Sequence, residues 1–229
     1  MISFRSTTKC SLAAGTIVGL LATMICPLAE AFTLFETAAL GPTGIADAGF
    51  EITNVQSVGA RFEVTSPVTT TRVGAHLIDS VFPYVGNKQV YAAIIALSGP
   101  TDLPDSTILI TPDVLGAALL PLLETSAEVS APLSLSLQPG WYALQIGSWQ
   151  FGASGWGVLT RNNIDIGRPD YYTRRDDQYS DTGMSDARLF VEAIPEPSAI
   201  LLLVAGLAAY PFFAQHRRPR PACTVLQER

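Results

Sequence analysis

Cysteine and histidine are nearly absent from the middle of this 229-residue chain. The three cysteines, Cys10, Cys26 and Cys223, all lie outside residues 32–197, so that segment has no disulfide and no thiolate nucleophile. His76 is the only histidine in the segment, and a Ser-His-Asp triad or a zinc site would depend on it alone. No Gly-x-Ser-x-Gly turn accompanies it. We therefore expect a protein that is not an enzyme.

Charge is scarce and one-sided. Charged residues make up 15% of the chain, against roughly 25% in an average globular protein. Residues 32–197 hold 18 Asp and Glu but only 8 Lys and Arg, a net charge of −10. So acidic a segment argues against nucleic acid and against charge-driven binding to anionic lipid. Neutral polysaccharide, divalent cations and plain solubility all remain compatible with it.

The N-terminus has the layout of a secretory signal peptide, which we place at residues 1–31. Two basic residues precede the apolar run 11–25, and small residues follow it. Ala29 and Ala31 are the small residues that a signal peptidase requires, so we expect cleavage after Ala31. The run is short for a membrane span of about 20 residues, which argues against an uncleaved anchor.

A second apolar run, residues 198–214, has 17 residues without a charge and is at the lower limit for a transmembrane helix. A basic cluster follows at 216–220. Its arginines are Arg217, Arg218 and Arg220. Basic residues mark the cytoplasmic side of a span, and the basic N-terminus has the same preference, so we expect residues 32–197 outside the cytoplasmic membrane. A buried helix of a globular domain is the alternative, but it leaves the basic cluster unexplained.

Directly before this run, Pro195, Glu196 and Pro197 form a Pro-Glu-Pro tripeptide. Proline lacks an amide donor and disfavours helix in the residue before it, so we expect an extended, exposed segment that suits a processing enzyme. In order, the signal peptide, tripeptide, apolar run and arginines resemble the PEP-CTERM sorting signal, also catalogued as the ice-binding protein C-terminal domain. The resemblance covers Ile194 to Arg220, and we place the sorting signal at residues 193–220. Residues 221–229 form a polar tail beyond the arginines, where that family usually ends.

The resemblance implies a processing partner and a location. In that family an exosortase, a membrane protease-transpeptidase of Gram-negative bacteria, reads the signal. The substrates are often linked to exopolysaccharide and biofilm. The chain is thus expected to be exported across the cytoplasmic membrane and to be membrane-anchored, or to reach the cell surface or extracellular matrix after processing. Neither a nucleic acid partner nor a cofactor is expected.

Between the two signals the apolar residues mostly alternate with polar ones, as in half-buried strands. The expected strands are Thr33–Glu36, Phe50–Thr53, Val58–Val64, Val73–Leu77, Gln89–Leu97, Thr107–Thr111, Leu133–Leu137, Tyr142–Ile146, Gly157–Thr160 and Arg188–Val191. Val114–Leu123 is the exception, and the Thr-Pro-Asp before it predicts a short helix there. The alternation places His76 and Trp141 on the solvent side of their strands.

About ten short strands with turn signals favour an all-β fold over residues 32–192. We expect an antiparallel β-sandwich of jelly-roll type, with a partly open barrel as the alternative. The segments SPVTTTRVG at 66–74 and LQPGWYAL at 137–144 also loosely resemble β-sandwich domains of PEP-CTERM proteins. Most of those domains have no assigned activity.

Two groups of side chains suggest binding chemistry. Asp176, Asp177 and Asp181 lie in an acidic stretch that could ligate Ca²⁺, or that is simply a solvated loop, because it lacks the spacing of an EF-hand. Trp141 and Trp156 belong to an aromatic group that either stacks on sugar rings or fills the core. The alternatives to a non-enzymatic surface protein are therefore a carbohydrate- or calcium-binding module and, from the late carboxylates, a glycan hydrolase.

Overall fold

The computed structural model describes residues 30–45, 49–80, 86–167 and 170–196. The expected signal peptide up to Ala29 lies outside these residues, and so does everything from Pro197 onward. The expected transmembrane run, basic cluster and polar tail are therefore not described.

All regular structure in the described residues is β-strand, and every pairing is antiparallel. The strands are β1 (Phe32–Glu36), β2 (Ala38–Ala39), β3 (Gly49–Ile52), β4 (Gln56–Val64), β5 (Val68–Asp79), β6 (Gln89–Leu97), β7 (Val114–Pro121), β8 (Ala127–Pro132), β9 (Ser136–Leu137), β10 (Gly140–Gly147), β11 (Gly157–Thr160), β12 (Ile164–Asp165), β13 (Tyr171–Arg175), β14 (Gln178–Asp181) and β15 (Leu189–Pro195). The expectation of an all-β, antiparallel domain is confirmed.

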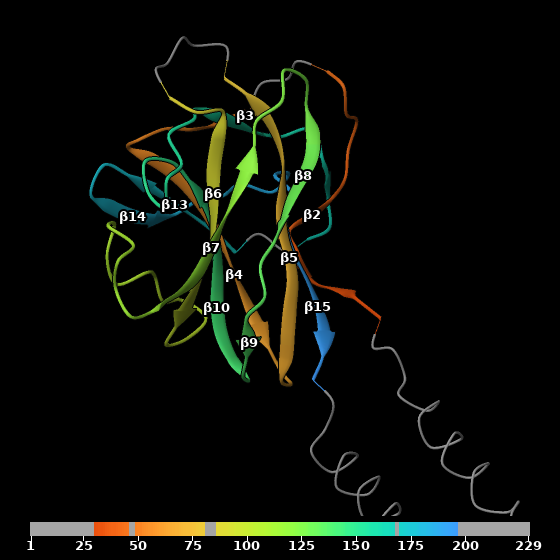
Figure 1. The fold of residues 1–229 in the computed structure, drawn as a ribbon, viewed down its shortest axis with the longest axis vertical. Coiled ribbons are helices and arrows are strands. Elements are labelled where there is room, and N and C mark those ends of the chain that lie inside the picture. The colour runs from red at the N-terminus through yellow and green to blue at the C-terminus, as the bar shows by residue number, and fades with distance from the viewer. Residues whose placement is uncertain (1–29, 46–48, 81–85, 168–169, 197–229) are drawn as a thin grey trace, which may run out of the picture. The chain divides into compact units, whose positions relative to one another are not determined.

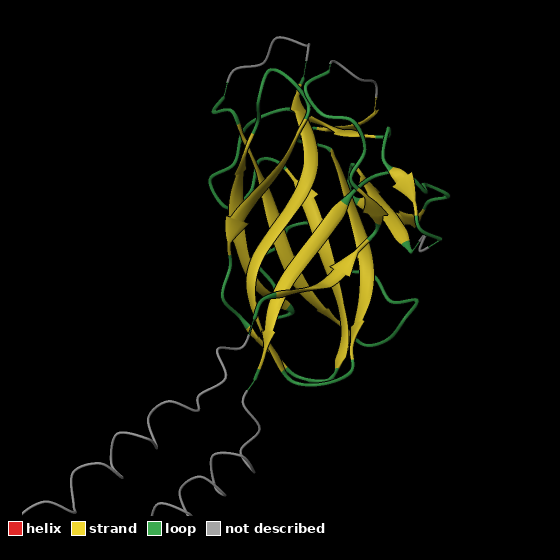
Figure 2. Ribbon diagram, turned by 90° about the vertical axis from the view of Figure 1, so that its right-hand side faces the viewer, coloured by secondary structure: helices red, strands yellow, loops and turns green. Residues whose placement is uncertain are grey.

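The strands form two large sheets that face each other (Figures 1 and 2). The seven-stranded sheet has the order β1-β15-β5-β11-β3, with β8 and β9 also paired to β5. The six-stranded sheet has the order β14-β13-β4-β10-β6-β7, and β12 pairs with β2 in a small third sheet. The chain moves between the two large sheets, for example from β4 to β5 and back to β6. The arrangement is a β-sandwich.

The main core lies between the two large sheets, and alternate residues of each strand fill it. In β10, Tyr142, Leu144 and Ile146 all belong to this core and are buried. Removing a side chain such as Leu144 from water contributes roughly 1.5–3 kcal/mol. The alternation therefore determines which face of each strand points inward.

A second, smaller core covers the outer face of the six-stranded sheet. It consists of Tyr91, Ala93, Ile95, Leu109 and Ala153. Because Leu109 belongs to the long connection 98–113 between β6 and β7, that connection packs over the sheet. Strand β6 is thus buried on both faces, as its continuous apolar sequence predicts.

Three local expectations are wrong. Val114–Leu123 is not a helix, because β7 pairs with β6 from Gln89↔Pro121 to Ile95↔Val114, and this pairing overrides the local helix signal. Thr107–Thr111 is not a strand but part of the connection over the second core. Within Leu133–Leu137 only the last two residues are strand, and the β8 strand lies before them.

Candidate functional site

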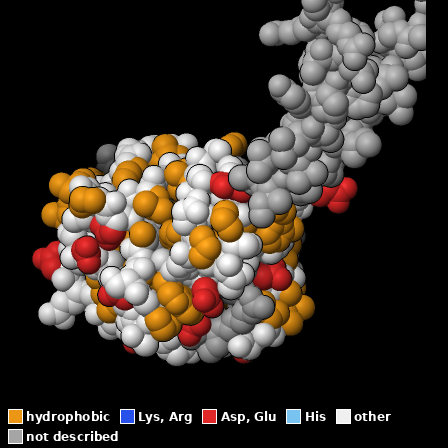
Figure 3. Space-filling view, turned by 90° about the horizontal axis from the view of Figure 1, so that it is seen from below, with side chains coloured by type: hydrophobic (Ala, Val, Ile, Leu, Met, Phe, Trp, Pro, Cys, Tyr) orange, Lys and Arg blue, Asp and Glu red, His pale blue; other side chains and the backbone are white. Residues whose placement is uncertain are grey.

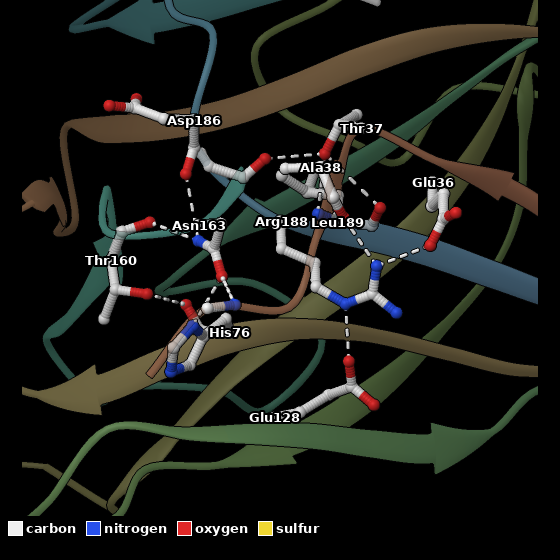
Figure 4. A network of polar contacts seen from close by, with 12 residues as sticks. Glu36, Thr37, Ala38, His76, Glu128, Thr160, Asn163, Asp186, Arg188 and Leu189 are labelled. Atoms are coloured by element: carbon white, nitrogen blue, oxygen red, sulfur yellow. Dashed lines mark hydrogen bonds and ion pairs between the residues drawn. The ribbon is translucent and has the colours of Figure 1, made fainter. Parts of the chain in front are cut away.

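His76 is not on the surface as expected, but is fully buried. Its Nδ1 atom lies 2.7 Å from Oδ1 of Asn163 (Figure 4). The Asn163 amide also donates from Nδ2 to the carbonyls of Thr160 and Asp186, which fixes Oδ1 as the acceptor. Because that oxygen only accepts, Nδ1 of His76 carries the proton. The histidine is one member of a buried hydrogen-bond network, and neither a serine nor a carboxylate is among its partners in the described residues.

Arg188 is the centre of a second polar cluster, which joins three strands (Figure 4). Its Nε donates to Glu128 on β8 at 2.5 Å, and its Nη1 donates to Glu36 on β1 at 2.6 Å. Nη1 also donates to the carbonyl of Ala38 at 2.5 Å. Arg188 directly precedes β15. The cluster therefore joins the start of this strand to β1 and β2 on one side and to β8 on the other. We assign it a structural role.

The structure does not bring the three predicted calcium ligands together. Asp176 and Asp177 form the turn between β13 and β14, whereas Asp181 ends β14 and pairs with Arg61 at 2.6 Å. In the described part of the chain, no group of three or more His, Cys, Asp and Glu is arranged to hold a metal ion. Asp181 is thus better explained as the partner of a buried arginine.

The two predicted sugar-stacking residues, Trp141 and Trp156, are both partly buried. Two other aromatics nearby in the sequence, Trp149 and Phe151, lie in the connection between β10 and β11 and are exposed. Trp149 is 54% exposed. A loop residue has no alternation to indicate which way its side chain points, so the sequence offers no signal that selects Trp149 over its neighbours.

A surface depression of about 330 Å³ lies beside Trp149. Four segments far apart in the sequence contribute to it. The lining residues are Asn54, Thr107, Ile108, Ser148, Trp149, Gln150, Arg174 and Asp177. Of the predicted site residues, only Asp177 is among them.

Two side chains hold the walls of this depression in place. Gln150 accepts from the amide of Leu109 at 2.6 Å and donates to the carbonyl of Thr107 at 3.1 Å, which joins two connections. Arg174 donates to the carbonyl of Thr107 at 3.0 Å and to that of Asn54 at 2.6 Å. Only 7% of Arg174 is exposed, so its guanidinium acts as a buried brace.

The sorting tripeptide begins within the last strand of the sandwich, because Pro195 is the final residue of β15. In β15, Ile194 and Pro195 are paired with Thr69 and Val68 of β5. This agrees with the expected extended conformation, and Pro195 is exposed. Glu196, however, is partly buried, since its carboxylate accepts hydrogen bonds from the hydroxyls of Thr69, at 3.3 Å, and Ser136. The expectation of a fully exposed tripeptide is therefore wrong at Glu196.

The chain enters and leaves the sandwich at the same end, because Phe32 of β1 is paired with Ala193 of β15. Figure 3 views the lower end of the sandwich as drawn in Figure 1. The described side chains visible there are acidic, apolar or neutral, with no lysine or arginine among them. No helix in the described residues is both long and apolar enough to span a membrane.

Comparison of the sequence with models of known protein families finds no match, and a search of curated proteins also finds none. The fold and the geometry described above therefore carry the functional argument.

Proposed function

We propose that the chain is an exported cell-surface or extracellular-matrix protein without catalytic activity, sorted through a PEP-CTERM-like signal in a Gram-negative bacterium. Its partner in this step is an exosortase-type processing enzyme. The observation that carries the proposal is the position of the tripeptide. The last strand of the sandwich runs directly into Pro195 and Glu196, with the uncharged run and the arginines following in the sequence.

We further infer that the sandwich is a jelly roll. Eight strands support this inference, in two sheets with the orders β1-β15-β5-β8 and β4-β10-β6-β7. The chain visits them so that the first and last strands are neighbours, as in two Greek keys wound together. A fold of this kind hosts many unrelated functions, so it does not by itself assign one.

Intact mass of the protein recovered from cells tests the sorting proposal. The expected mature chain begins at Phe32 and lacks the apolar run 198–214. Replacing Pro195, Glu196 and Pro197 by alanine is expected to leave the run in place. A wild-type chain that still carries residues 198–229 would mean anchoring without cleavage, and a chain that stays in the cytoplasm would refute export.

Docking of Glu196 on the sandwich has a consequence for processing. An enzyme that reads the tripeptide must first separate Glu196 from Thr69 and Ser136. These two hydrogen bonds contribute about 1–2 kcal/mol in total, which corresponds to a roughly 5–30-fold change in the undocked population. Thr69→Val combined with Ser136→Ala is therefore expected to accelerate processing.

A matched control is available two residues further along β5, at Thr71. The hydroxyl of Thr71 has no hydrogen-bond partner among the described residues, so Thr71→Val removes a hydroxyl without releasing Glu196. The measurement is the ratio of processed to unprocessed chain after a pulse of synthesis. Equal ratios for the double variant and the Thr71→Val control contradict the docking argument but not the sorting proposal.

A further inference from the structure

We propose that the depression beside Trp149 binds a neutral saccharide, with the indole ring stacked on the sugar and the surrounding polar side chains bound to its hydroxyls. The site is distinct from the sorting signal and from the predicted residues Trp141 and Trp156. It is formed by the connections that precede β4, β7, β11 and β14, together with Arg174 of β13.

The first argument is the conformation of Trp149. Its backbone φ is +64°, a left-handed value that non-glycine residues rarely adopt and that costs on the order of 1–3 kcal/mol. The side chain nevertheless lies 54% exposed and belongs to neither of the two cores. Packing within the domain therefore does not account for this strained residue. A flat apolar ring held toward solvent offers a stacking surface to a ligand.

The second argument is the set of polar groups around the ring. Among the described residues, no hydrogen bond or ion pair is made by the side chains of Asn54, Thr107 or Asp177. An amide both donates and accepts, a hydroxyl can do either, and a carboxylate accepts. Such a mixed set matches sugar hydroxyls, which also donate and accept. The remaining polar residues are held by the domain itself. Ser148 donates to the carbonyl of Gly155 at 2.6 Å, and Gln150 and Arg174 hold the loops and so keep the site preformed.

Charge and size favour a neutral saccharide over other ligands. The guanidinium of Arg174 is buried and already donates to two carbonyls, whereas Asp177 presents a carboxylate at the rim. Residues 32–197 carry a net charge of −10, which disfavours an anionic polymer. No cluster of three metal-ligating side chains occurs in the described residues. A volume of about 330 Å³ is small for a binding pocket, and suits one or two sugar rings.

Affinity electrophoresis of the full chain in mild detergent tests the proposal. The gels contain dextran, mannan or xylan as neutral probes, alginate as the anionic probe, or no polysaccharide. We expect retardation by at least one neutral probe and not by alginate. Trp149→Ala is expected to weaken the retardation about tenfold or more, as for other central aromatic contacts. Asn54→Ala and Asp177→Asn are expected to weaken it several-fold.

Trp141→Ala is the matched control, since Trp141 lies on a strand and does not line the depression. Its retardation is expected to equal that of the wild type. Urea unfolding of each variant establishes that the sandwich is intact. Three results overturn the proposal: no retardation by any neutral probe, retardation by alginate alone, or equal binding by the Trp149→Ala and Trp141→Ala variants. None of them bears on intact mass, so the sorting proposal is tested separately.

Discussion

Replacing Asn163 by alanine is the most informative perturbation of the sandwich. This single amide accepts from the backbone N–H of Gly41 and from Nδ1 of His76, and donates to the carbonyls of Thr160 and Asp186. The four contacts tie the segment after β2, strand β5 and the connection before β15 to one side chain. Asn163→Ala removes all four at once.

The expected cost follows from what the substitution leaves unpaired. Two donors lose their acceptor, Nδ1 of His76, which is buried, and the N–H of Gly41, which is partly buried. An unpaired buried group costs about 1–3 kcal/mol, and a partly buried one costs less. The two carbonyls add less, because each retains another lone pair for water. We expect a loss of about 3–5 kcal/mol in the free energy of unfolding, a large share of the 5–15 kcal/mol typical of a domain.

Asn162→Ala supplies a control of the same chemistry at the neighbouring position. Its amide makes one exposed hydrogen bond, from Nδ2 to the carbonyl of Pro42 at 2.9 Å. We expect a cost of at most about 1 kcal/mol. Both variants are compared with the wild type by urea unfolding of the full chain in mild detergent, followed by tryptophan fluorescence. Costs within 1 kcal/mol of each other would refute the assignment of His76 and Asn163 to one buried network.

Three further predictions concern other parts of the sandwich. Arg188→Leu leaves Glu36 and Glu128 without their partner, but both carboxylates stay partly exposed. We therefore expect urea unfolding to show a loss of about 2–3 kcal/mol in the free energy of unfolding, and a smaller loss in Glu128→Gln. Gly147→Ala places a methyl group against the ring of Tyr91 and is expected to lower the free energy of unfolding by roughly 1–3 kcal/mol. In the control Gly140→Ala, on the same strand, the added methyl group meets nothing closer than 3.8 Å, and the loss should be under about 1 kcal/mol. Equal losses would contradict the crowding at Tyr91. Burial raises the pKa of Tyr171 to about 12, so the protonated form is favoured in the folded state. The contribution of Tyr171 to stability should therefore be constant below about pH 10 and be lost between about pH 10 and 12. Phenolate absorbance titrating reversibly at the usual pKa for every tyrosine would count against this burial.

The sequence predicts a strand well where the pattern of apolar residues within that strand is sufficient to identify it. Gln89–Leu97 and Gly157–Thr160 have the bounds of β6 and β11, and the inward residues of β10 are those that the alternation selects. Val114–Leu123 was harder, because an apolar stretch at a sheet edge has the same composition as a short buried helix. Pairing with β6, which lies outside this stretch of the sequence, makes Val114–Pro121 a strand.

The site residues were harder to predict than the strands, for a related reason. Alternation correctly places His76 opposite the main core, but it contains no information on what later covers that face. In the structure Asn163, 87 residues further along the chain, lies there. The depression beside Trp149 similarly depends on four connections, and connections have no periodicity that indicates direction.

The pairing of β1 with β15 also has a consequence for the order of folding. Strand β15 lies between β1 and β5, so the seven-stranded sheet remains interrupted until the last strand arrives. Contacts such as Phe32↔Ala193 close a loop of almost the whole domain, and contacts of this range form slowly. If the chain is exported N-terminus first, as proposed, it cannot complete this sheet until Ile194 has crossed the membrane. Glu196 reaches Thr69 and Ser136 only after β15 has paired with β5 beside β9, so its hydrogen bonds form after the last strand has been added.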